Sequence, residues 1–384
     1  MIENLQFIVL APNSWLGQWM NRQQLFSRIG KRHKVTYSNG PLHSWQKGSE
    51  TYQNSPLLYA KELSNNVSVI KPSRLFARIA RIGFLDRIAV NRFVNAIDDS
   101  LEPKQPRCLY VFHPKYAEYI KHIPHDILVY HAYDDYSKQA SYGESERAAE
   151  EKLVTTADCV FASSKMIQKR LANLAGTRSV EFLPNGVDYQ HFATSKPPPL
   201  ELASVKHPQI GYVGSVNDKV DLNLLKALAQ RKPEYQFIIV GGFGRFDDQD
   251  GLLSDLQQTD NVHFLGSKSV DEIAAFMQHF DINTMLYRVD GKTWASSVYP
   301  LKLHEYLAAG KPVISADIDA VREFSDVVTI AQTTEQWISA IETGLSLNSS
   351  TECQRRQAVA AENTWDARVT QIMHRISACN KDIE

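Results

Sequence analysis

Short apolar runs alternate with amphipathic helical patterns along the whole chain. In the first half, such runs predict strands at 7–11, 34–37, 67–70, 108–112, 127–131 and 159–162. The second half repeats the alternation, with predicted strands at 210–213, 237–240, 262–264, 282–285, 312–315 and 327–330. Apolar runs separated by helices are typical of parallel sheets wrapped by helices. The pattern therefore predicts an α/β fold with two parallel sheets.

A proline-rich segment separates the two sets of strands. Residues 193–200 include three consecutive prolines, which fit neither a helix interior nor a central strand. We expect an extended linker there and a domain boundary near residue 200. The length of 384 residues agrees with two domains, because one hydrophobic core rarely serves so long a chain.

The composition excludes several classes of protein. With 43% hydrophobic residues, 22% charged residues and a net charge of −1, the chain is typical of globular proteins and not of dedicated nucleic-acid binders. No apolar run reaches the ~20 residues that a membrane-spanning helix needs. The four cysteines have neither metal-ligand spacing nor a paired pattern. We therefore predict a cytoplasmic protein without a metal site, a disulfide framework or a nucleic-acid partner.

The segment at 299–315 has the features of a ligand-binding helix followed by a strand. Pro300 suits the first turn of a helix, and Gly310 suits its C-terminus. Lys302 and Glu305 are three residues apart and project from one helical face. A lysine can neutralise a diphosphate, and a carboxylate can accept hydrogen bonds from two ribose hydroxyls. An ordinary surface ion pair is the alternative interpretation.

Four segments follow one another in a recognisable order. They are Phe-Leu-Pro-Asn-Gly-Val-Asp-Tyr-Gln-His-Phe at 182–192, Gln-Ile-Gly-Tyr-Val-Gly-Ser at 209–215, Asn-Val-His-Phe-Leu-Gly at 261–266, and the segment 299–315. Together they resemble the GT-B glycosyltransferases, particularly family 4 and its relatives that build bacterial surface polysaccharides. The resemblance implies two Rossmann-like domains whose parallel sheets face each other across a cleft. It places an acceptor-binding domain at 1–195 and a donor domain at 205–362, with a last helix at about 363–384 packed back on the first domain.

The same resemblance implies a donor site in the second half of the chain. The donor would be a nucleotide-diphosphate sugar, most often a uridine diphosphate sugar, bound without a cofactor or metal. The donor-binding residues would be Glu305 for the ribose, Lys302, Lys219, Gly214 and Ser215 for the diphosphate, Phe264 and Leu265 for the base, and Tyr299 and Leu301 beside them.

Two glycine- or acid-rich stretches invite other interpretations. Gly241-Gly-Phe-Gly244 lacks the G-x-G-x-x-G spacing of nicotinamide dehydrogenases, and we expect it to let the backbone approach the donor. Asp248 and Asp250 have the spacing of a metal-binding DxD motif. We interpret them as a solvated acidic loop, because GT-B enzymes bind diphosphates through helix N-termini and basic side chains.

The sequence departs from the family pattern where the pattern bears on mechanism. Family 4 enzymes usually carry two glutamates separated by seven residues, whereas Ser297 stands at the first position and Glu305 at the second. Asp134 and Asp135 end a predicted strand, and either carboxylate, Asp134 first, could deprotonate an acceptor hydroxyl. Helix capping is the alternative role for these aspartates. We therefore predict that transfer inverts the anomeric configuration of the sugar, in contrast to the retention that is typical of family 4.

Residues on the acceptor side are expected in the first domain. Gly17 and Trp15 lie in the loop after the first predicted strand, where open parallel sheets present their ligand crevice. His113 ends another predicted strand. Core packing is the alternative for Trp15, and a structural role is the alternative for His113.

A basic segment in the first half suggests contact with a membrane surface. Residues 71–94 contain six basic residues and one acidic residue, interleaved with apolar side chains. This is the pattern of an amphipathic helix on an anionic bilayer, which here would be the inner face of the cytoplasmic membrane. A core-packed helix with a solvated cationic face is the alternative.

The combined prediction is a glycosyltransferase of surface polysaccharide biosynthesis. It would move a sugar from a nucleotide-diphosphate donor to a saccharide acceptor, which is expected to be lipid-linked. A sugar-nucleotide epimerase of the same fold and a non-catalytic scaffold at the membrane are the alternatives.

Overall fold

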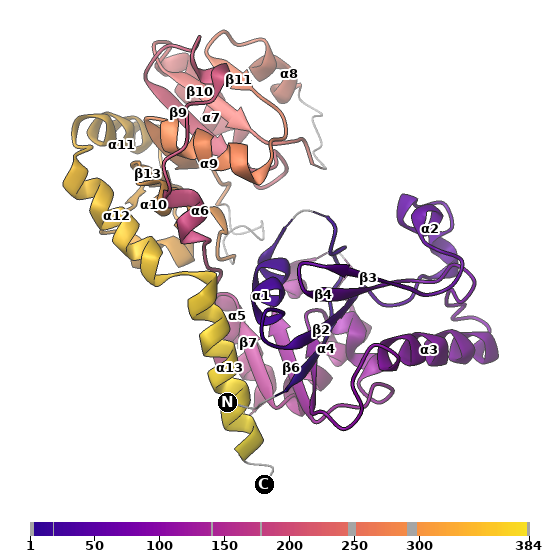
Figure 1. Ribbon diagram of the computed structural model, residues 1–384. Coiled ribbons are helices and arrows are strands. Elements are labelled where there is room, and N and C mark those ends of the chain that lie inside the picture. Colours follow the sequence, from indigo (N-terminus) through magenta and orange to yellow (C-terminus); the bar gives the residue numbers. More distant parts are fainter. Residues whose placement is uncertain are drawn as a thin grey trace. The chain divides into compact units, whose positions relative to one another are not determined.

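The structure is a computed structural model that describes residues 4–17, 19–139, 141–176, 179–244, 251–289 and 298–381. The chain forms two compact units, whose elements are labelled in Figure 1. Unit 1 comprises Met1–Pro184 and Arg368–Glu384, and unit 2 comprises Asn185–Ala367. Within the described residues, no helix combines the length and apolar character needed to cross a bilayer.

Unit 1 is built on an eight-stranded sheet. From one edge to the other its strands are β3 (Ala60–Ser64), β4 (Val67–Lys71), β2 (Lys34–Ser38), β1 (Gln6–Leu10), β5 (Arg107–Val111), β6 (Ile127–Ala132), β7 (Cys159–Ala162) and β8 (Val180–Phe182). Neighbours pair in parallel except β3 with β4. The strand order reverses between β1 and β5, which creates the crevice position typical of open α/β sheets.

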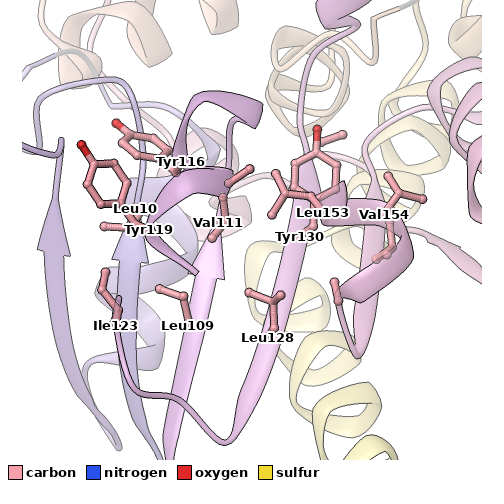
Figure 2. Packing of buried hydrophobic residues seen from close by; sticks show 14 of the residues in the cluster. Leu10, Leu109, Val111, Tyr116, Tyr119, Ile123, Leu128, Tyr130, Leu153 and Val154 are labelled. Atoms are coloured by element: carbon pink, nitrogen blue, oxygen red, sulfur yellow. The ribbon is translucent and has the colours of Figure 1, made fainter. Parts of the chain in front are cut away.

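Helices and a tyrosine-rich turn complete the core of unit 1. The helices are α1 (Asn21–Ile29), α2 (Glu50–Asn54), α3 (Gly83–Asp98), α4 (Glu144–Thr156), α5 (Lys165–Ala175) and the part of α13 (Trp365–Lys381) that begins at Arg368. Figure 2 shows Leu109 and Leu128 side by side on β5 and β6, with Tyr116 and Tyr119 of the 3₁₀ helix η2 (Pro114–Tyr119) nearer the carboxyl ends of the strands. Apolar burial thus fixes η2 at the edge of the sheet where the crevice lies.

Unit 2 is built on a six-stranded parallel sheet. Its strands are β11 (Val262–Phe264), β10 (Gln236–Val240), β9 (Gln209–Val213), β12 (Ile282–Met285), β13 (Val313–Ser315) and β14 (Thr329–Ile330), in that order. Its helices are α6 (Tyr189–Ala193), α7 (Leu222–Arg231), α8 (Leu252–Gln257), α9 (Val270–His279), α10 (Lys302–Ala309), α11 (Thr334–Ser346) and α12 (Ser350–Glu362). The carboxyl ends of β9 and β10 therefore lie side by side. In the chain, α10 is followed directly by β13.

The apolar pattern located the strands well. Every predicted strand is present, with ends that differ by two residues or fewer. The pattern missed β3 (Ala60–Ser64) and β8 (Val180–Phe182). The edge strand β3 is largely exposed and β8 has three residues, so neither needs an apolar run.

The division between the units differs from the predicted one. It falls after Pro184, and the triple-proline segment belongs to unit 2. Gln278 on α9 donates to the carbonyl oxygens of Phe192 and Thr194 and accepts from the N–H of Lys196. These hydrogen bonds attach the segment to unit 2, a tertiary contact that proline content does not reveal.

The basic segment 71–94 is only partly helical. Helix α3 begins at Gly83, and residues 72–82 form turns instead of the predicted helix. The hydroxyl of Ser73 donates to the carbonyl of Leu57 and accepts from the N–H of Phe76. This local hydrogen bonding competes with a helix, as is common for serine near proline.

Candidate functional site

Lys302 places a buried ammonium group beside the carboxyl end of β9. It is the first residue of α10, and 8% of its surface is exposed. Its Nζ lies 4.0 Å from the centre of the Tyr212 ring and 5.1 Å from the centre of the Tyr287 ring. Among the described residues, Nζ has no hydrogen-bond partner. The rings attract the cation but offer no lone pairs, so its three donors remain for an anionic ligand.

Two glycines let the strand-end loops approach this ammonium group. Gly214, at φ +142°, follows β9, and a Cβ atom there would lie 2.4 Å from Nζ of Lys302. Gly241, at φ +153°, follows β10, and its Cβ would lie 2.2 Å from the carbonyl oxygen of Gly214. Side chains at these positions would therefore collide with backbone or with the lysine. The result is a backbone cradle next to a cation, which suits phosphate groups.

The two lysines of the site strengthen its positive potential. Nζ of Lys219 lies 5.5 Å from the centre of the Tyr287 ring, so the same ring faces both lysines. Burial holds the pKa of Lys302 well below its usual value, the charge of Lys219 lowers it further, and Glu305 acts in the opposite direction. Burial also lowers the pKa of Lys219. A bound diphosphate would favour the charged forms of both lysines.

Glu305 lies one turn after Lys302 on α10 and keeps part of its surface exposed. Burial raises the pKa of its carboxyl group to about 7, although Lys302 acts in the opposite direction. The alternative interpretation of a surface ion pair is wrong, because Lys302 is buried and its Nζ has no partner among the described residues. The helix instead presents two separate polar groups, a cation and a carboxyl group that titrates near neutrality.

The predicted base-binding residues lie at the neighbouring strand. Phe264 ends β11, and its ring centre is 5.7 Å from that of Phe243, which is 49% exposed. The N–H of Leu265 donates to the carbonyl of Ile239 and so continues the sheet for one residue. An exposed aromatic ring beside strand-end backbone can stack on a nucleobase.

Three other predicted donor residues have different positions. Ser215 follows Gly214 in the cradle, and its carbonyl accepts a hydrogen bond from the Tyr212 hydroxyl. Tyr299 is 5% exposed, and its hydroxyl lies 2.7 Å from Nε2 of His304 in the interior. Leu301 is the residue before α10. Tyr299 therefore supports the start of α10 from within, whereas Ser215 belongs to the cradle itself.

Sequence reasoning missed the aromatic box around Lys302. Tyr212 lies in β9, and Tyr287 follows β12, so both resemble core residues in the apolar pattern. No local signal marks them, because their role depends on which strands become neighbours. Ser297, Asp248 and Asp250 lie outside the described residues. Among the described residues, no cluster of three or more His, Cys, Asp or Glu could hold a metal ion.

The two aspartates after β6 have separate environments in unit 1. Asp134 accepts from the N–H of Asp135 and from the side chain of Gln139, and burial raises the pKa of its carboxyl group. Asp135 is 3% exposed, and its Oδ1 lies 3.0 Å from Nε of Arg170. Arg170 also binds both carboxylate oxygens of Glu150. Asp135 thus belongs to a buried ion-pair network, which explains its position without catalysis.

The predicted acceptor-side residues are mostly held by local structure. Nδ1 of His113 accepts from the N–H of Lys115 and caps η2, and burial lowers the pKa of His113 to about 4. Trp15 is 1% exposed and packs 5.0 Å from the Tyr37 ring. A Cβ atom at Gly17 would make only ordinary contacts, so close approach does not require this glycine.

A pocket of about 670 Å³ lies within unit 1, at the loops that follow its strands. Its walls include the polar side chains of Asn39, His43 and Gln46 and the rings of Tyr116 and Tyr119. The volume is in the range of small-molecule sites. Loops after β1, β2 and β4, together with α2 and η2, therefore form a concave polar surface on the crevice side of the sheet.

The predicted residues border this pocket without lining it. Trp15, Gly17 and His113 are absent from its walls, whereas their sequence neighbours Ser14, Leu16 and Lys115 contribute to them. The loops named from the sequence contribute to the pocket, because strand ends can be read from the apolar pattern. The side chains named from the sequence do not line it, because loop conformation decides which residues face the pocket.

Comparisons with known proteins agree with this architecture. Residues 207–346 match the family of glycosyl transferases group 1. A Bacillus subtilis (strain 168) protein, named TuaH as a glycosyltransferase of teichuronic acid biosynthesis, is 28% identical over 238 residues. That match covers 59% of this chain and spans 58% of the relative's length.

Solved structures resemble the whole chain. Trehalose-6-phosphate synthase OtsA matches with a TM-score of 0.69 at 12% identity, covering 98% of this chain and 99% of that one. Sucrose-phosphate synthase from Thermosynechococcus elongatus matches with a TM-score of 0.69 at 16% identity, covering 97% of this chain and 98% of that one. Anabaena Alr3699/HepE, solved with UDP and glucose, matches with a TM-score of 0.66 at 18% identity, covering 98% of this chain and 99% of that one. At these identities the likeness concerns the fold alone, and it confirms the predicted two-domain GT-B fold.

Substitution of Glu305 should alter how stability depends on pH. The ordinary pKa of this group is 4.5 and its folded value is about 7, so between these pH values the folded state holds a proton that the unfolded state has released. Stability therefore falls as pH rises through this window. We expect Glu305→Gln to have the same free energy of unfolding as the wild type at pH 4.5. At pH 7.5 we expect its free energy of unfolding to be higher by up to about 3 kcal/mol.

Thermal unfolding between pH 4.5 and 7.5 measures this effect, with Glu362→Gln on the exposed end of α12 as the matched control. The control should follow the wild type at every pH. A stability difference for Glu305→Gln that does not grow with pH would contradict the buried environment assigned to Glu305.

Proposed function

We propose that this chain, which belongs to the group 1 glycosyltransferases with the GT-B fold, transfers a sugar from a nucleoside-diphosphate donor to a saccharide acceptor. One observation carries the proposal. The unpartnered ammonium of Lys302 is buried against the Gly214 and Gly241 loops, where only an anionic ligand would satisfy it. A diphosphate has the charge and the size for this position.

The remaining donor contacts follow from the same geometry. Lys302 and Lys219 would neutralise the diphosphate, and the Gly214–Ser215 backbone would lie against it. Glu305, one turn along α10, would accept hydrogen bonds from the ribose hydroxyls when ionised. The exposed ring of Phe243 beside Phe264 would stack on the base. We favour uridine diphosphate, because a structural neighbour of this chain was solved with UDP and glucose.

We propose that transfer retains the anomeric configuration. The predicted preference for inversion is not supported, because the chain falls in a family whose enzymes are retaining. Asp135 is held by Arg170, and Asp134 accepts two hydrogen bonds within its own turn. The main contribution of the chain to the reaction is then electrostatic. The lysines would stabilise the negative charge that develops on the diphosphate as it leaves the sugar.

The pocket of unit 1 is the proposed acceptor site. The amide side chains of Asn39, Gln46 and Asn54 can exchange hydrogen bonds with sugar hydroxyls, and the rings of Tyr116 and Tyr119 offer apolar faces. A sequence relative is named for teichuronic acid biosynthesis. We therefore propose a saccharide acceptor in surface polysaccharide synthesis, which would be carried on a lipid.

A lipid-linked acceptor would require contact with a membrane, and unit 1 has a suitable surface. Exposed apolar side chains gather on the segment 71–94, namely Leu75, Ile82, Phe84 and Leu85. Leu57 lies next to Leu75, because its carbonyl accepts from the N–H of Leu75. Arg74, Arg81 and Arg87 are exposed on the same segment. Arg78 does not contribute, since it pairs with Asp86 and Glu118.

Nucleotide binding should depend on Lys302. We expect UDP to raise the melting temperature of the wild type, because it binds the folded state only. Lys302→Met should weaken UDP binding by about 10- to 100-fold, the effect of losing a charge-assisted hydrogen bond. Thermal shift with UDP, GDP and ADP measures this, and Lys206→Met, at an exposed lysine of unit 2, is the matched control. An equal UDP-induced shift in melting temperature in both variants would contradict the proposed binding of the diphosphate by Lys302.

Filling the acceptor pocket should separate sugar transfer from donor hydrolysis. Thr51 lines the pocket, so Thr51→Trp should reduce transfer to a saccharide acceptor by about 10-fold or more, since a bulky ring occupies the acceptor volume. UDP release by hydrolysis and UDP binding should stay unchanged. Thr155→Trp, on the exposed face of α4, is the control. Parallel loss of transfer and hydrolysis would argue against an acceptor role, and sugar conversion without UDP release would favour the epimerase alternative.

Binding to anionic vesicles should depend on the apolar side chains of the basic segment. We expect the wild type to sediment with vesicles of phosphatidylglycerol and phosphatidylcholine, and less at high salt. Phe84→Asp should weaken this binding by about 10-fold. The substitution removes apolar area that would be buried in the bilayer, and it adds a negative charge that the anionic lipids repel. The control is Leu347→Asp, at an exposed leucine of unit 2. Equal sedimentation of both variants would exclude this surface.

A further inference from the structure

Arg22 is a buried cation without an ionic partner in unit 1. It lies in the first turn of α1, and 1% of its surface is exposed. Its Nε and Nη1 atoms are buried and have no hydrogen-bond partner among the residues that the structure describes. The guanidinium carbon lies 4.1 Å from the centre of the Tyr133 ring, at the carboxyl end of β6. The group is thus held at the crevice edge of the sheet by the Tyr133 side chain, through stacking and a hydrogen bond, and the N–H donors of Nε and Nη1 are not used by the described residues.

The nearby carboxylate of Asp134, whose pKa is raised by burial and lowered by the charge of Arg22, does not form an ion pair with it. The carboxylate oxygens of Asp134 accept from the N–H of Asp135 and from Gln139, and no described carboxylate forms an ion pair with Arg22. The first turn of α1 contains no acidic residue. Burial, together with the charge of Arg22, lowers the pKa of His131 to about 3, so this neighbouring ring is neutral and adds no charge. The positive end of the α1 dipole adds to the unbalanced charge.

A second unused donor belongs to the loop before α1. Trp15 is 1% exposed, and its Nε1 has no hydrogen-bond partner among the described residues. Its ring packs against Tyr37, whose hydroxyl pKa is raised by burial and lowered by the charge of Arg22. Folded proteins rarely leave buried N–H donors without a hydrogen-bond partner, and an unpaired buried charge greatly reduces the stability of the folded state. Such a group is retained when a ligand supplies its partner.

We propose that Arg22, at the N-terminus of α1, forms an oxyanion site in unit 1 that binds a carboxylate or phosphate group of a substrate. The planar guanidinium can hold such a group through two parallel hydrogen bonds. The helix N-terminus favours the same charge. The assignment of the ligand as a substrate rests on the proposed glycosyl transfer. The anion would belong to an acidic or phosphorylated acceptor sugar.

The ligand-free protein provides the first test. Because no described carboxylate forms an ion pair with Arg22, Arg22→Met should leave the melting temperature unchanged or raise it, in the absence of phosphate and nucleotide. Arg32→Met, at an exposed arginine just after α1, is the matched control and should have no effect. A marked loss of stability confined to Arg22→Met would overturn the proposal, because it would indicate that protein groups already compensate the guanidinium.

Anion binding provides the second test. Inorganic phosphate and glucuronate should raise the melting temperature of the wild type and of Arg32→Met above the level reached with chloride at equal ionic strength. Arg22→Met should lose this shift, and Arg22→Lys, which keeps the charge without the planar fork, should keep only part of it. A phosphate shift that is equal in the wild type and both Arg22 variants would overturn the proposal.

A UDP titration of Arg22→Met identifies the source of the anion. An unchanged UDP shift supports the assignment to the acceptor, and a lost UDP shift would overturn that assignment. Failure of this proposal remains distinct from failure of the proposed function, because UDP binding through Lys302 is measured separately in unit 2.

Discussion

The close approach of the β9 and β10 loops to the ammonium group of Lys302 is the constraint on which the proposed donor site depends. Gly214 and Gly241 permit it, because a side chain at either position would occupy the space of the lysine or of the facing backbone. The aromatic rings of Tyr212 and Tyr287 then hold the cation without neutralising it. The charge therefore stays unsatisfied until a ligand provides oxygen atoms.

Unit 1 uses its charged groups differently. Glu150, Arg170 and Asp135 satisfy one another in a buried network, and Arg78 is paired with Asp86 and Glu118. Against this background, the unpaired guanidinium of Arg22 is an exception. The contrast between compensated and uncompensated buried charges separates groups that organise the sheet edge from groups that await a ligand.

Much of the fold could be predicted from the sequence, and less of the site. Strand positions follow from apolar runs because each central strand is buried on both faces. The helix of Lys302 and Glu305 could be located because its proline and glycine mark both ends. In contrast, the sequence left either Asp134 or Asp135 as the candidate base, with Asp134 first. Only the contact of Asp135 with Arg170, 35 residues away on α5, distinguishes them.

The sequence by itself determined the two parallel sheets, the strand ends and the helix that carries the donor-site cation, since these depend on local periodicity and on residues close in the chain. The tertiary structure decided the boundary after Pro184, the aromatic box of Tyr212 and Tyr287, and the isolation of Arg22. The physical reason is that burial, and with it the energetic state of a charge, depends on neighbours that are distant in the chain.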